Sequence, residues 1–348
     1  MIPYSSFKRK PDQSVELTND AIGHLTKVYM FCDKNNDNNV GPNETKYFFQ
    51  TAPDSPWNEA PYNNATEETK NGGLSYESYL SLWSLMTLID PARSLEYLIY
   101  LGFENDPSSA IRVTRRRVLD RKEQKSERKV VQCFVFGPKN AGKSALLNRF
   151  IGRSYNDENN NGSTEERYAV NTVDKSGVHA HKKKILVMKE IQILEENAFI
   201  LSNEALASCD VAIFVYDSSD ESSWKRAIDL LAEVATTSKD AGFKFPCLMV
   251  ASKTDLDPFP MANEESTRVT EEIGIEDPIQ ISSKLGEFGK LFEIILAAAE
   301  HPHMSIPNIE SEKKRRCKLI KKSLMIVGTA SLVVGLASIR LYAARKQC

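Results

Sequence analysis

Residues 137–144, with the sequence Gly-Pro-Lys-Asn-Ala-Gly-Lys-Ser, have the composition and spacing of a phosphate-binding loop. They follow the apolar run 130–136 and precede apolar side chains at helical spacing, which predicts a strand, a turn and a helix. The glycines let backbone N–H groups turn inward, where the start of the helix adds partial positive charge. Lys143 can reach the β- and γ-phosphates, and the Ser144 hydroxyl can bind Mg²⁺. Unless this is a chance turn before a helix, the phosphate contacts are Gly137, Asn140, Ala141, Gly142, Lys143 and Ser144.

Two later motifs point to the base of the nucleotide. The predicted strand 246–251 ends in Ser-Lys-Thr-Asp (252–255), a Lys-x-Asp pattern whose carboxylate can accept two hydrogen bonds from guanine. Serine stands there in place of the usual Asn or Thr. The strand-like run 279–281 leads to Ser-Ser-Lys, which resembles a loop that packs on the base. A kinase, the competing class of phosphate-loop protein, would not need these residues at a strand end. The predicted base contacts are Lys253, Asp255, Ser282, Ser283 and Lys284.

The segment between these motifs predicts a metal site but no efficient hydrolysis. The polar stretch 153–166 lies where a switch segment is expected, and the strand 168–173 follows it. A guanine-nucleotide switch ends its next strand with Asp-x-x-Gly, whose Asp holds Mg²⁺ through water. Here residues 190–193 are Glu-Ile-Gln-Ile, with no glutamine directly after them to orient an attacking water. The expected Mg²⁺ ligands are Ser144, Thr172 and Glu190, Lys143 supplies charge to the phosphates, and no catalytic residue is assigned.

Residues 33–44 have the oxygen spacing of a Ca²⁺ loop. Oxygen-bearing side chains fall at loop positions 1, 3, 5 and 12, and position 7 would donate a backbone carbonyl. Asn38 replaces the glycine expected at the sharp turn, and asparagine tolerates that backbone better than most residues. The alternative is an Asn-rich polar loop that binds no metal. The predicted Ca²⁺ ligands are Asp33, Asn35, Asp37, Asn39 and Glu44.

A partner for this loop is harder to find. Residues 73–75 predict a short strand facing Val40, and an apolar helix follows from Tyr76 to Ile89. No run of carboxylates precedes that helix, so the partner would be a ligand-free EF-hand. A second apolar helix follows Asp90-Pro91. It either occupies the groove of the EF-hand pair, as a bound peptide would, or is an ordinary helix of a small core.

Charge is distributed unevenly along the 348 residues, whose formal net charge is -2. The chain before Lys313 has 35 basic and 47 acidic residues, whereas ten basic and no acidic residues follow Glu312. Nucleic-acid binding is therefore not expected. Six cysteines without CxxC spacing suit a reducing compartment, and we expect neither a signal peptide nor a mitochondrial presequence.

The C-terminal residues predict a membrane anchor. Residues 323–339 carry no charge, and the span 323–344 has the ~20 residues that cross a bilayer. Basic residues flank it, so we expect a tail anchor with the body in the cytosol, in the mitochondrial outer membrane rather than the ER. A buried amphipathic helix fits poorly, because the run is apolar all round. Ser331 and Gly335 are a weak sign of a homodimer.

These features predict a multi-domain chain: an all-α EF-hand pair, an α/β phosphate-loop domain of Ras-like type and a transmembrane helix. The expected divisions are a lead-in (1–17), the EF-hand pair and following helix (18–110), a charged linker (111–129), the nucleotide domain (130–304), a basic connector (305–322) and the anchor (323–344).

In this order the parts resemble the C-terminal portion of the Miro mitochondrial Rho GTPases, in a plant-like version. The resemblance covers nearly the whole chain and rests on residues 3–5, 12–18, 33–44, 95–98, 100–102, 168–173 and 251–253. It implies GTP or GDP, Mg²⁺ and Ca²⁺ as ligands, and a role in mitochondrial distribution and morphology through adaptors, motors or organelle-contact proteins. Family members also carry an N-terminal GTPase domain and a first EF-hand, so we expect a truncated relative or a fragment. Two functions stay open, a slow GTPase switch and a scaffold that binds nucleotide without turnover.

Overall fold

The computed structural model describes residues 9–70, 72–155, 166–174, 183–192, 202–260 and 262–309. Its first part is helical, and each long helix begins at a residue that can cap it. The Thr18 hydroxyl accepts from the N–H of Ala21, as a helix start requires, and Ser75 and Asp90 do the same for the next two helices. The elements are α1 (Asn19–Cys32), α2 (Tyr76–Ile89) and α3 (Pro91–Tyr100), with the 3-10 turns η2 (Thr45–Tyr47), η3 (Pro56–Asn58) and η4 (Pro107–Ala110).

The loop after α1 is held by a two-stranded pairing, as predicted. Strand β2 (Asn39–Val40) runs antiparallel to β3 (Leu74–Ser75), with Val40 opposite Leu74. The described residues between the two strands form only 3-10 turns, so the second hand has an exiting helix, α2, but no entering helix. In register with the Ca²⁺ loop, the partner loop is residues 67–78, which has an acid at its first position but Ser78 in place of the bidentate glutamate at its last.

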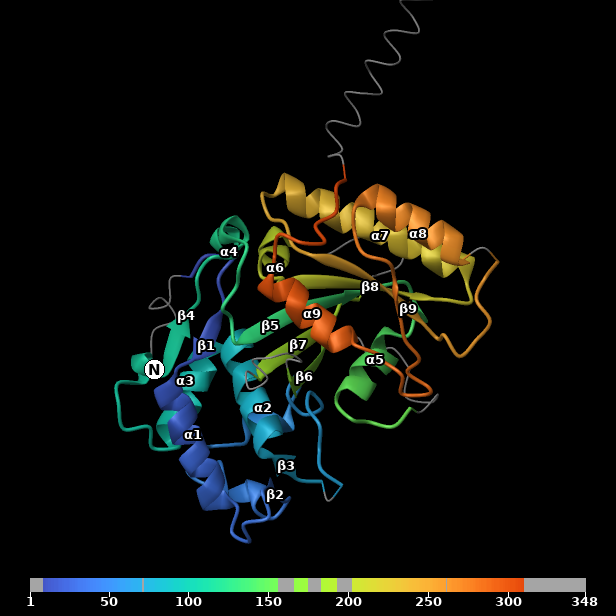
Figure 1. Ribbon diagram of the computed structural model, residues 1–348. Helices are drawn as coiled ribbons and strands as arrows, with labels where there is room; N and C mark the ends of the chain where they lie inside the picture. The colour runs from blue at the N-terminus through green and yellow to red at the C-terminus, as the bar shows by residue number, and fades with distance from the viewer. Residues whose placement is uncertain are drawn as a thin grey trace, which may run out of the picture. The chain divides into compact units, whose positions relative to one another are not determined.

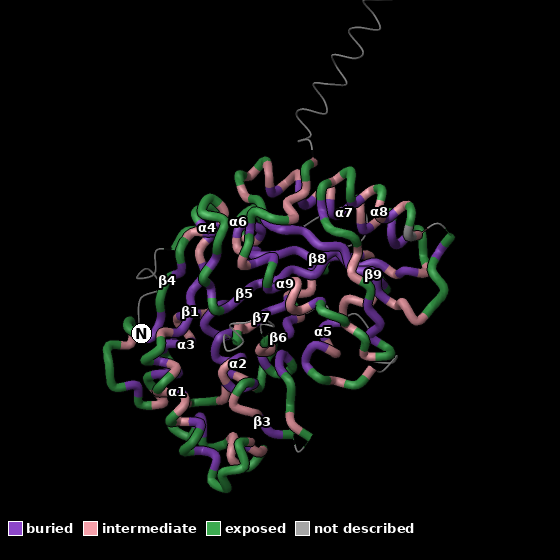
Figure 2. Tube along the Cα trace, in the orientation of Figure 1, coloured by how far each residue is buried: buried purple, intermediate pink, exposed green. Residues whose placement is uncertain are grey.

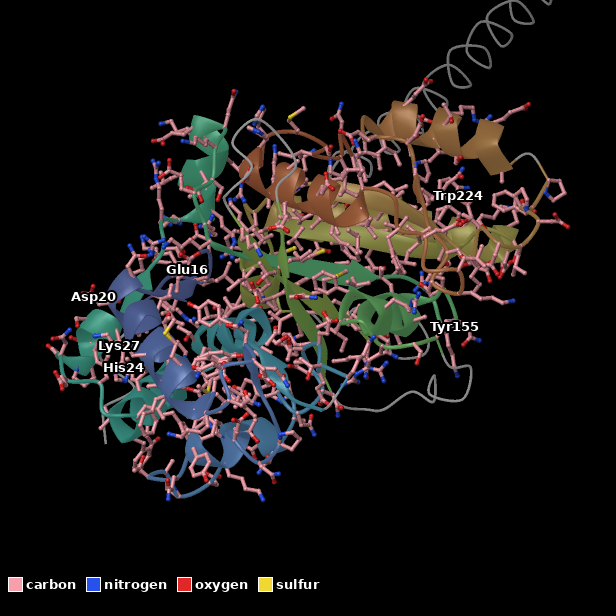
Figure 3. The ribbon with its side chains drawn as sticks, turned by 60° about the horizontal axis from the view of Figure 1, so that its bottom comes forward. Glu16, Asp20, His24, Lys27, Tyr155 and Trp224 are labelled. Carbon is pink, nitrogen blue, oxygen red and sulfur yellow. The ribbon has the colours of Figure 1, made fainter. Side chains whose placement is uncertain are left out.

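The expectation of an irregular lead-in is wrong for residues 15–17. They form β1 (Val15–Leu17), which pairs antiparallel with β4 (Ile111–Val113). Only three residues pair, and Glu16 interrupts the apolar pattern, so the strand gives little local signal. Glu16 is nevertheless buried, because its carboxylate accepts from the N–H groups of Lys129 and Val130 at 2.9 and 3.1 Å (Figure 3).

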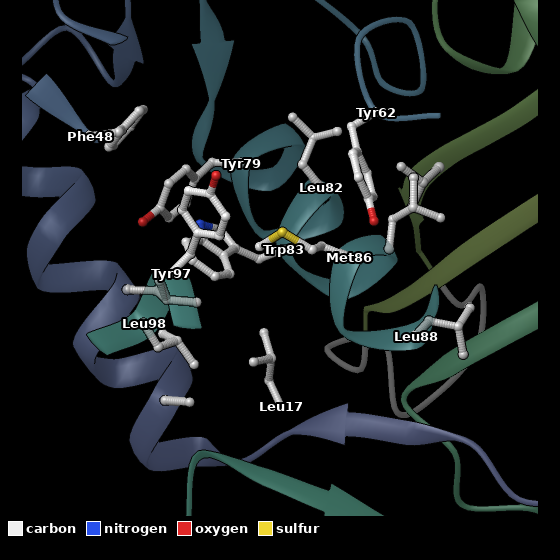
Figure 4. Packing of buried hydrophobic residues seen from close by; sticks show 14 of the residues in the cluster. Leu17, Phe48, Tyr62, Tyr79, Leu82, Trp83, Met86, Leu88, Tyr97 and Leu98 are labelled. Atoms are coloured by element: carbon white, nitrogen blue, oxygen red, sulfur yellow. The ribbon is translucent and has the colours of Figure 1, made fainter. Parts of the chain in front are cut away.

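Aromatic side chains fill the core of the helical part. Trp83 of α2 is fully buried, and Tyr79 stacks on Phe48 at a centroid distance of 4.8 Å (Figure 4). Leu95 and Leu98 of α3 are fully buried in the same cluster. α3 is therefore a permanent part of this core, which favours the core-helix interpretation over a peptide-like occupant of a groove.

The second part is a six-stranded sheet in the order β10-β9-β8-β5-β7-β6, in which β6 alone is antiparallel to its neighbour (Figure 1). Helices α5 and α9 cover one face, and α7 packs on the other through Trp224 and Tyr216. Strands β5, β8 and β9 are buried along almost their whole length, whereas β6 and β7 are buried at their centres (Figure 2). The strands are β5 (Val130–Phe136), β6 (Arg167–Val173), β7 (Lys184–Glu190), β8 (Val211–Asp217), β9 (Cys247–Ser252) and β10 (Ile279–Gln280). The helices are α4 (Arg117–Glu123), α5 (Lys143–Phe150), α6 (Asn203–Ala207), α7 (Glu221–Asp240), α8 (Ala262–Ile273) and α9 (Leu291–Glu300).

The helical part and the sheet share one hydrophobic core. α2 packs on the face of β6 and β7 that points away from α5, where Tyr168, Val170 and Val187 join the helical cluster. The backbone N–H of Val170 donates to the Ala65 carbonyl at 2.6 Å, and the Thr66 hydroxyl donates to the Val170 carbonyl at 3.1 Å. The outer edge of β6 is thus capped by the helical part, which protects an otherwise open sheet edge.

The charged stretch 111–129 is packed rather than a solvated spacer. Arg117 donates to both carboxylate oxygens of Asp210, at 2.7 and 3.0 Å, and both side chains are at most 5% exposed. Arg128 is buried beside them, where it donates to Asp120 and lies 3.7 Å from Asp210. Asp210 precedes β8 and also accepts from the N–H of Gln132 in β5. These ion pairs fasten α4 to the sheet.

The predicted membrane anchor, residues 323–344, lies outside the described residues. Among the helices that the structure does describe, none has the length and apolar character needed to cross a bilayer.

Asp210→Asn is expected to destabilise the protein by about 3–5 kcal/mol at pH 7, because buried Arg117 loses its counter-charge and buried Arg128 keeps only Asp120. Burial alone raises the pKa of Asp210, but Arg117 and Arg128 outweigh it and hold that pKa below 3.8. The native carboxylate therefore stabilises the fold above about pH 4, and this contribution is lost as the pH falls further.

Urea unfolding at pH 7 measures the loss of stability in the Asp210 variant, and unfolding of wild type at acid pH measures the loss of the carboxylate's contribution. Glu123→Gln is the control, since Glu123 pairs with Arg115 at the surface and its loss should be near neutral. Equal stability of the Asp210 variant and wild type at pH 7 would contradict a stabilising role for the buried pairs.

Candidate functional site

The phosphate-loop backbone passes so close to β8 that only glycine fits at its start. Gly137 has φ 152°, and a Cβ there would lie 2.2 Å from the Val215 carbonyl oxygen. Gly142 has φ 92°, in the region that disfavours other residues, and α5 begins at the next residue. The two predicted glycines thus turn the chain from β5 into the N-terminus of α5, where backbone N–H groups can face an anion.

Lys143 is held across this turn. Its Nζ donates to the carbonyls of Gly137 and Pro138, both at 2.9 Å. Burial lowers the pKa of Lys143, and the nearby Glu190 carboxylate opposes that shift. A partly desolvated cation that two carbonyl oxygens contact is well placed to bind phosphate oxygens.

Ser144 contacts the acid that ends β7. Its hydroxyl lies 3.0 and 2.9 Å from the two carboxylate oxygens of Glu190. Glu190 reaches it because β7 runs parallel to β5 and pairs Glu190 with Val135, two residues before the loop. Nε of Arg167, on the adjoining strand, lies 3.9 Å from Glu190. The hydroxyl and the carboxylate are oxygen donors of the kind Mg²⁺ prefers, so these residues fit the ion.

The predicted base-reading residues meet at the ends of β9 and β10. Asp255 accepts from the Ser282 hydroxyl at 2.7 Å, and Lys284 Nζ lies 3.9 Å from its other oxygen. The Ser252 hydroxyl lies 2.6 Å from the Ala141 carbonyl, so the serine ties the base-reading strand to the phosphate loop. Ser283 is buried, and its hydroxyl has no hydrogen-bond partner among the described residues.

Lys253 is fixed by an acid that the sequence interpretation did not include. Its Nζ donates to Asp217, at the end of β8, at 2.6 Å. Burial raises the pKa of Asp217, but hydrogen bonds from Lys253 and Ser219 outweigh this and lower it. The ion pair holds the lysine stem along the wall where a sugar and base would lie.

One cavity of ≈ 570 Å³ joins the phosphate loop to the base-reading residues. Its lining also includes Lys139, Tyr155 and Leu256, which were not predicted. Tyr155 follows α5 and offers an aromatic face to the cavity (Figure 3). The one feature of the sequence that could have pointed to it is that it is an aromatic residue in a polar stretch. Predicted residues in the lining are Asn140, Gly142, Lys143, Ser144, Glu190, Lys253, Asp255, Ser283 and Lys284, whereas Gly137, Ala141 and Ser282 support it from behind.

The structure does not bring Thr172 to this site. Thr172 pairs with Ile185, whereas Arg167 pairs with Glu190, because β6 runs antiparallel to β7. Five residues of strand separate the two positions, or about 16 Å. Thr172 instead lies 3.5 Å from Ser81 of α2, measured between their hydroxyl oxygens, so its expected approach to Mg²⁺ is wrong.

The predicted Ca²⁺ loop has the turn that such a loop requires. Asn38 has φ 60°, and its N–H donates to Asp33 at 2.9 Å. Asp37 accepts from the N–H of Asn39 at 2.8 Å, and Glu44 accepts from Lys34 and Gly41 at 3.0 Å. Each carboxylate oxygen keeps a second lone pair, so the donor types fit a calcium ion. Across the described part of the chain, however, no three acidic, His or Cys side chains gather closely enough to hold an ion.

Comparison with known proteins matches two families to this chain, one in the helical part and one in the nucleotide domain. Residues 57–125 match the family described as "EF hand associated", and residues 132–298 match the Ras family. The chain is 67% identical over its whole length to Mitochondrial Rho GTPase 3 of Arabidopsis thaliana, of which it covers 54%. It is 59% identical over 99% of its length to Mitochondrial Rho GTPase 1 of the same plant, and 30% identical over 95% to its namesake in Saccharomyces cerevisiae. It covers 53% and 50% of those two.

The chain thus spans about half the length of the curated relatives that it matches, and the match includes both the helical part and the nucleotide domain. Identity at this level, on a helical EF-hand-associated region followed by a Ras-like α/β domain, places the chain in the mitochondrial Rho GTPase family.

Proposed function

We propose that the chain is a guanine-nucleotide-binding protein, anchored by its tail in the mitochondrial outer membrane, that acts as a slow GTPase switch. The observation that supports this best is the single cavity lined by Lys143, Ser144, Lys253 and Asp255. This lining supports the proposal, because a lysine and a hydroxyl suited to phosphate and metal lie at one end and a carboxylate suited to guanine lies at the other.

Each residue has a separate task in that proposal. Lys143 and the N-terminus of α5 neutralise phosphate charge, and Asp255 accepts from the N1–H and amino group of guanine. Ser144 and Glu190 would hold Mg²⁺, which when bound supplies positive charge to the phosphates. Turnover is slow because the end of β7 carries Glu190-Ile191-Gln192, not the sequence that usually positions water after this strand.

Asp255→Asn is expected to lower GDP affinity by at least about 100-fold, since two hydrogen bonds to a charged acceptor are lost, at about 1.5–3 kcal/mol each. The variant should instead favour xanthosine diphosphate, whose C2 oxygen can accept from the new amide. Fluorescence titration with GDP and with xanthosine diphosphate measures whether the variant now binds the second more tightly. Glu264→Gln on the exposed surface of α8 is the control. Unchanged GDP affinity in the Asp255 variant would rule out this carboxylate as the base reader.

The second candidate function is a membrane scaffold that binds nucleotide without turnover, and the Glu-Ile-Gln-Ile sequence at 190–193 favours it. Single-turnover assays with radiolabelled GTP separate the two functions. A switch should convert bound GTP to GDP faster than a Lys143→Asn control, which removes the phosphate-binding cation. Loss of GTP no faster than in that control would leave only the scaffold.

Cellular roles follow from the family and from the tail. The span 323–344, uncharged up to residue 339, would anchor the chain with its body in the cytosol, where adaptors, motors or organelle-contact proteins could bind it. The printed names of the relatives support a mitochondrial location. We therefore extend the proposal to mitochondrial distribution and morphology, with a homodimer through Ser331 and Gly335 as a further possibility.

Calcium is the second proposed input, through Asp33, Asn35, Asp37, the Asn39 carbonyl and Glu44. Titration calorimetry of the wild type should give a Kd in the range of about 10⁻⁷–10⁻⁵ M. Glu44→Gln removes the bidentate ligand and should weaken binding at least about tenfold. Glu96→Gln, on the exposed side of α3, should leave the titration unchanged. A wild type that gives no heat on Ca²⁺ addition would contradict the metal site and favour the plain polar loop.

A further inference from the structure

The spacing between Ser144 and Glu190 matches two ligands of one magnesium ion. Mg²⁺ binds six oxygens in near-ideal octahedral geometry at about 2.0–2.1 Å, so neighbouring ligand oxygens lie about 2.9 Å apart. The Ser144 hydroxyl lies 3.0 and 2.9 Å from the carboxylate oxygens of Glu190. Either carboxylate oxygen can therefore share an ion with the hydroxyl without moving.

We propose that Glu190 binds Mg²⁺ directly, in place of the water that separates the metal from the shorter aspartate usual at this position. The proposal rests on the nucleotide site described above and concerns only how that site holds its metal. The additional methylene of glutamate gives the carboxylate the reach to touch Ser144. An aspartate on the same backbone would stop short by about one carbon–carbon bond.

The surroundings of Glu190 hold its carboxylate in that position. Its backbone pairs with Val135 on one side and Arg167 on the other, so strand register fixes where the side chain begins. The side chain is 12% exposed, and Nε of Arg167 lies 3.9 Å from it. Lys143 is the second cation near it. Two cations thus flank the carboxylate, and the Arg167 contact is longer than the hydrogen bonds of 3.0 and 2.9 Å that Ser144 makes.

Direct ligation changes the number of waters on the metal, which can be counted. Besides Ser144 and a β-phosphate oxygen, a directly bound Glu190 leaves about three of six positions for water, whereas an outer Glu190 leaves about four. The full chain in detergent, loaded with GDP and Mn²⁺ in place of Mg²⁺, is measured by electron paramagnetic resonance in ¹⁷O-enriched water. Line broadening reports the waters bound to Mn²⁺.

Wild type is expected to carry about three waters and Glu190→Asp about four. Glu190→Gln keeps the length and one oxygen, so it should retain the wild-type count while Mn²⁺ binds at least about tenfold more weakly. Glu166→Gln is the matched control, because Glu166 is an acid directly before the neighbouring strand β6 and accepts from Lys189 instead. Its count should equal that of wild type.

Two results would overturn the inference while leaving guanine-nucleotide binding intact. One is an equal water count in wild type and Glu190→Asp. The other is wild type that binds GDP but no Mn²⁺, in which case the Glu190–Ser144 hydrogen bond closes the site to metal. Failure of the wild type to bind GDP at all would remove the proposed function as well, and a titration without metal identifies that case.

Discussion

The apolar face that β6 and β7 turn away from α5 has to be covered, and α2 covers it. Tyr168, Val170 and Val187 would otherwise expose a contiguous apolar surface to water. Because α2 also forms the core of the helical part through Trp83, one set of side chains stabilises both parts. The EF-hand-like helices therefore support the nucleotide domain directly and cannot be treated as a separate module joined by a flexible linker.

Ionic contacts fix how the helical part lies on the sheet. Apolar contacts alone would not fix this orientation, because they are not directional. Buried carboxylates are costly unless each is fully paired, so Asp210 and Glu16 can adopt only one arrangement of partners. Asp210 joins α4 to the start of β8, and Glu16 joins β1 to the start of β5. Both contacts lie at the starts of parallel strands, and the nucleotide site lies at the opposite ends. The contacts of Asp210 and Glu16 therefore fix the strands at their starts. The polar groups at the opposite ends stay available for ligands.

The sequence predicted what local patterns encode and missed what distant contacts decide. The strand, turn and helix around residues 137–144 follow from local patterns, and they were predicted correctly. The pairing of residues 73–75 with Val40 was also predicted, from the pattern of the Ca²⁺ loop. Strand β1 has only three residues, and its partner lies about a hundred positions away, so no local pattern reveals it. Thr172 was misplaced because strand direction decides which end of β6 meets the site, and that direction is set by pairing with β7.

The hairpin of β6 and β7 connects the shared core to the metal-binding acid. Glu190 is the last residue of β7 and lies opposite Arg167, at the end of the same hairpin whose face α2 covers. A carboxylate at a strand end moves with that strand, and octahedral magnesium tolerates only small errors in ligand position. Packing of α2 on Tyr168 and Val170 therefore determines more than stability. It also supports the strands that carry Glu190, and with them the distance to Ser144 on which the proposed metal site depends.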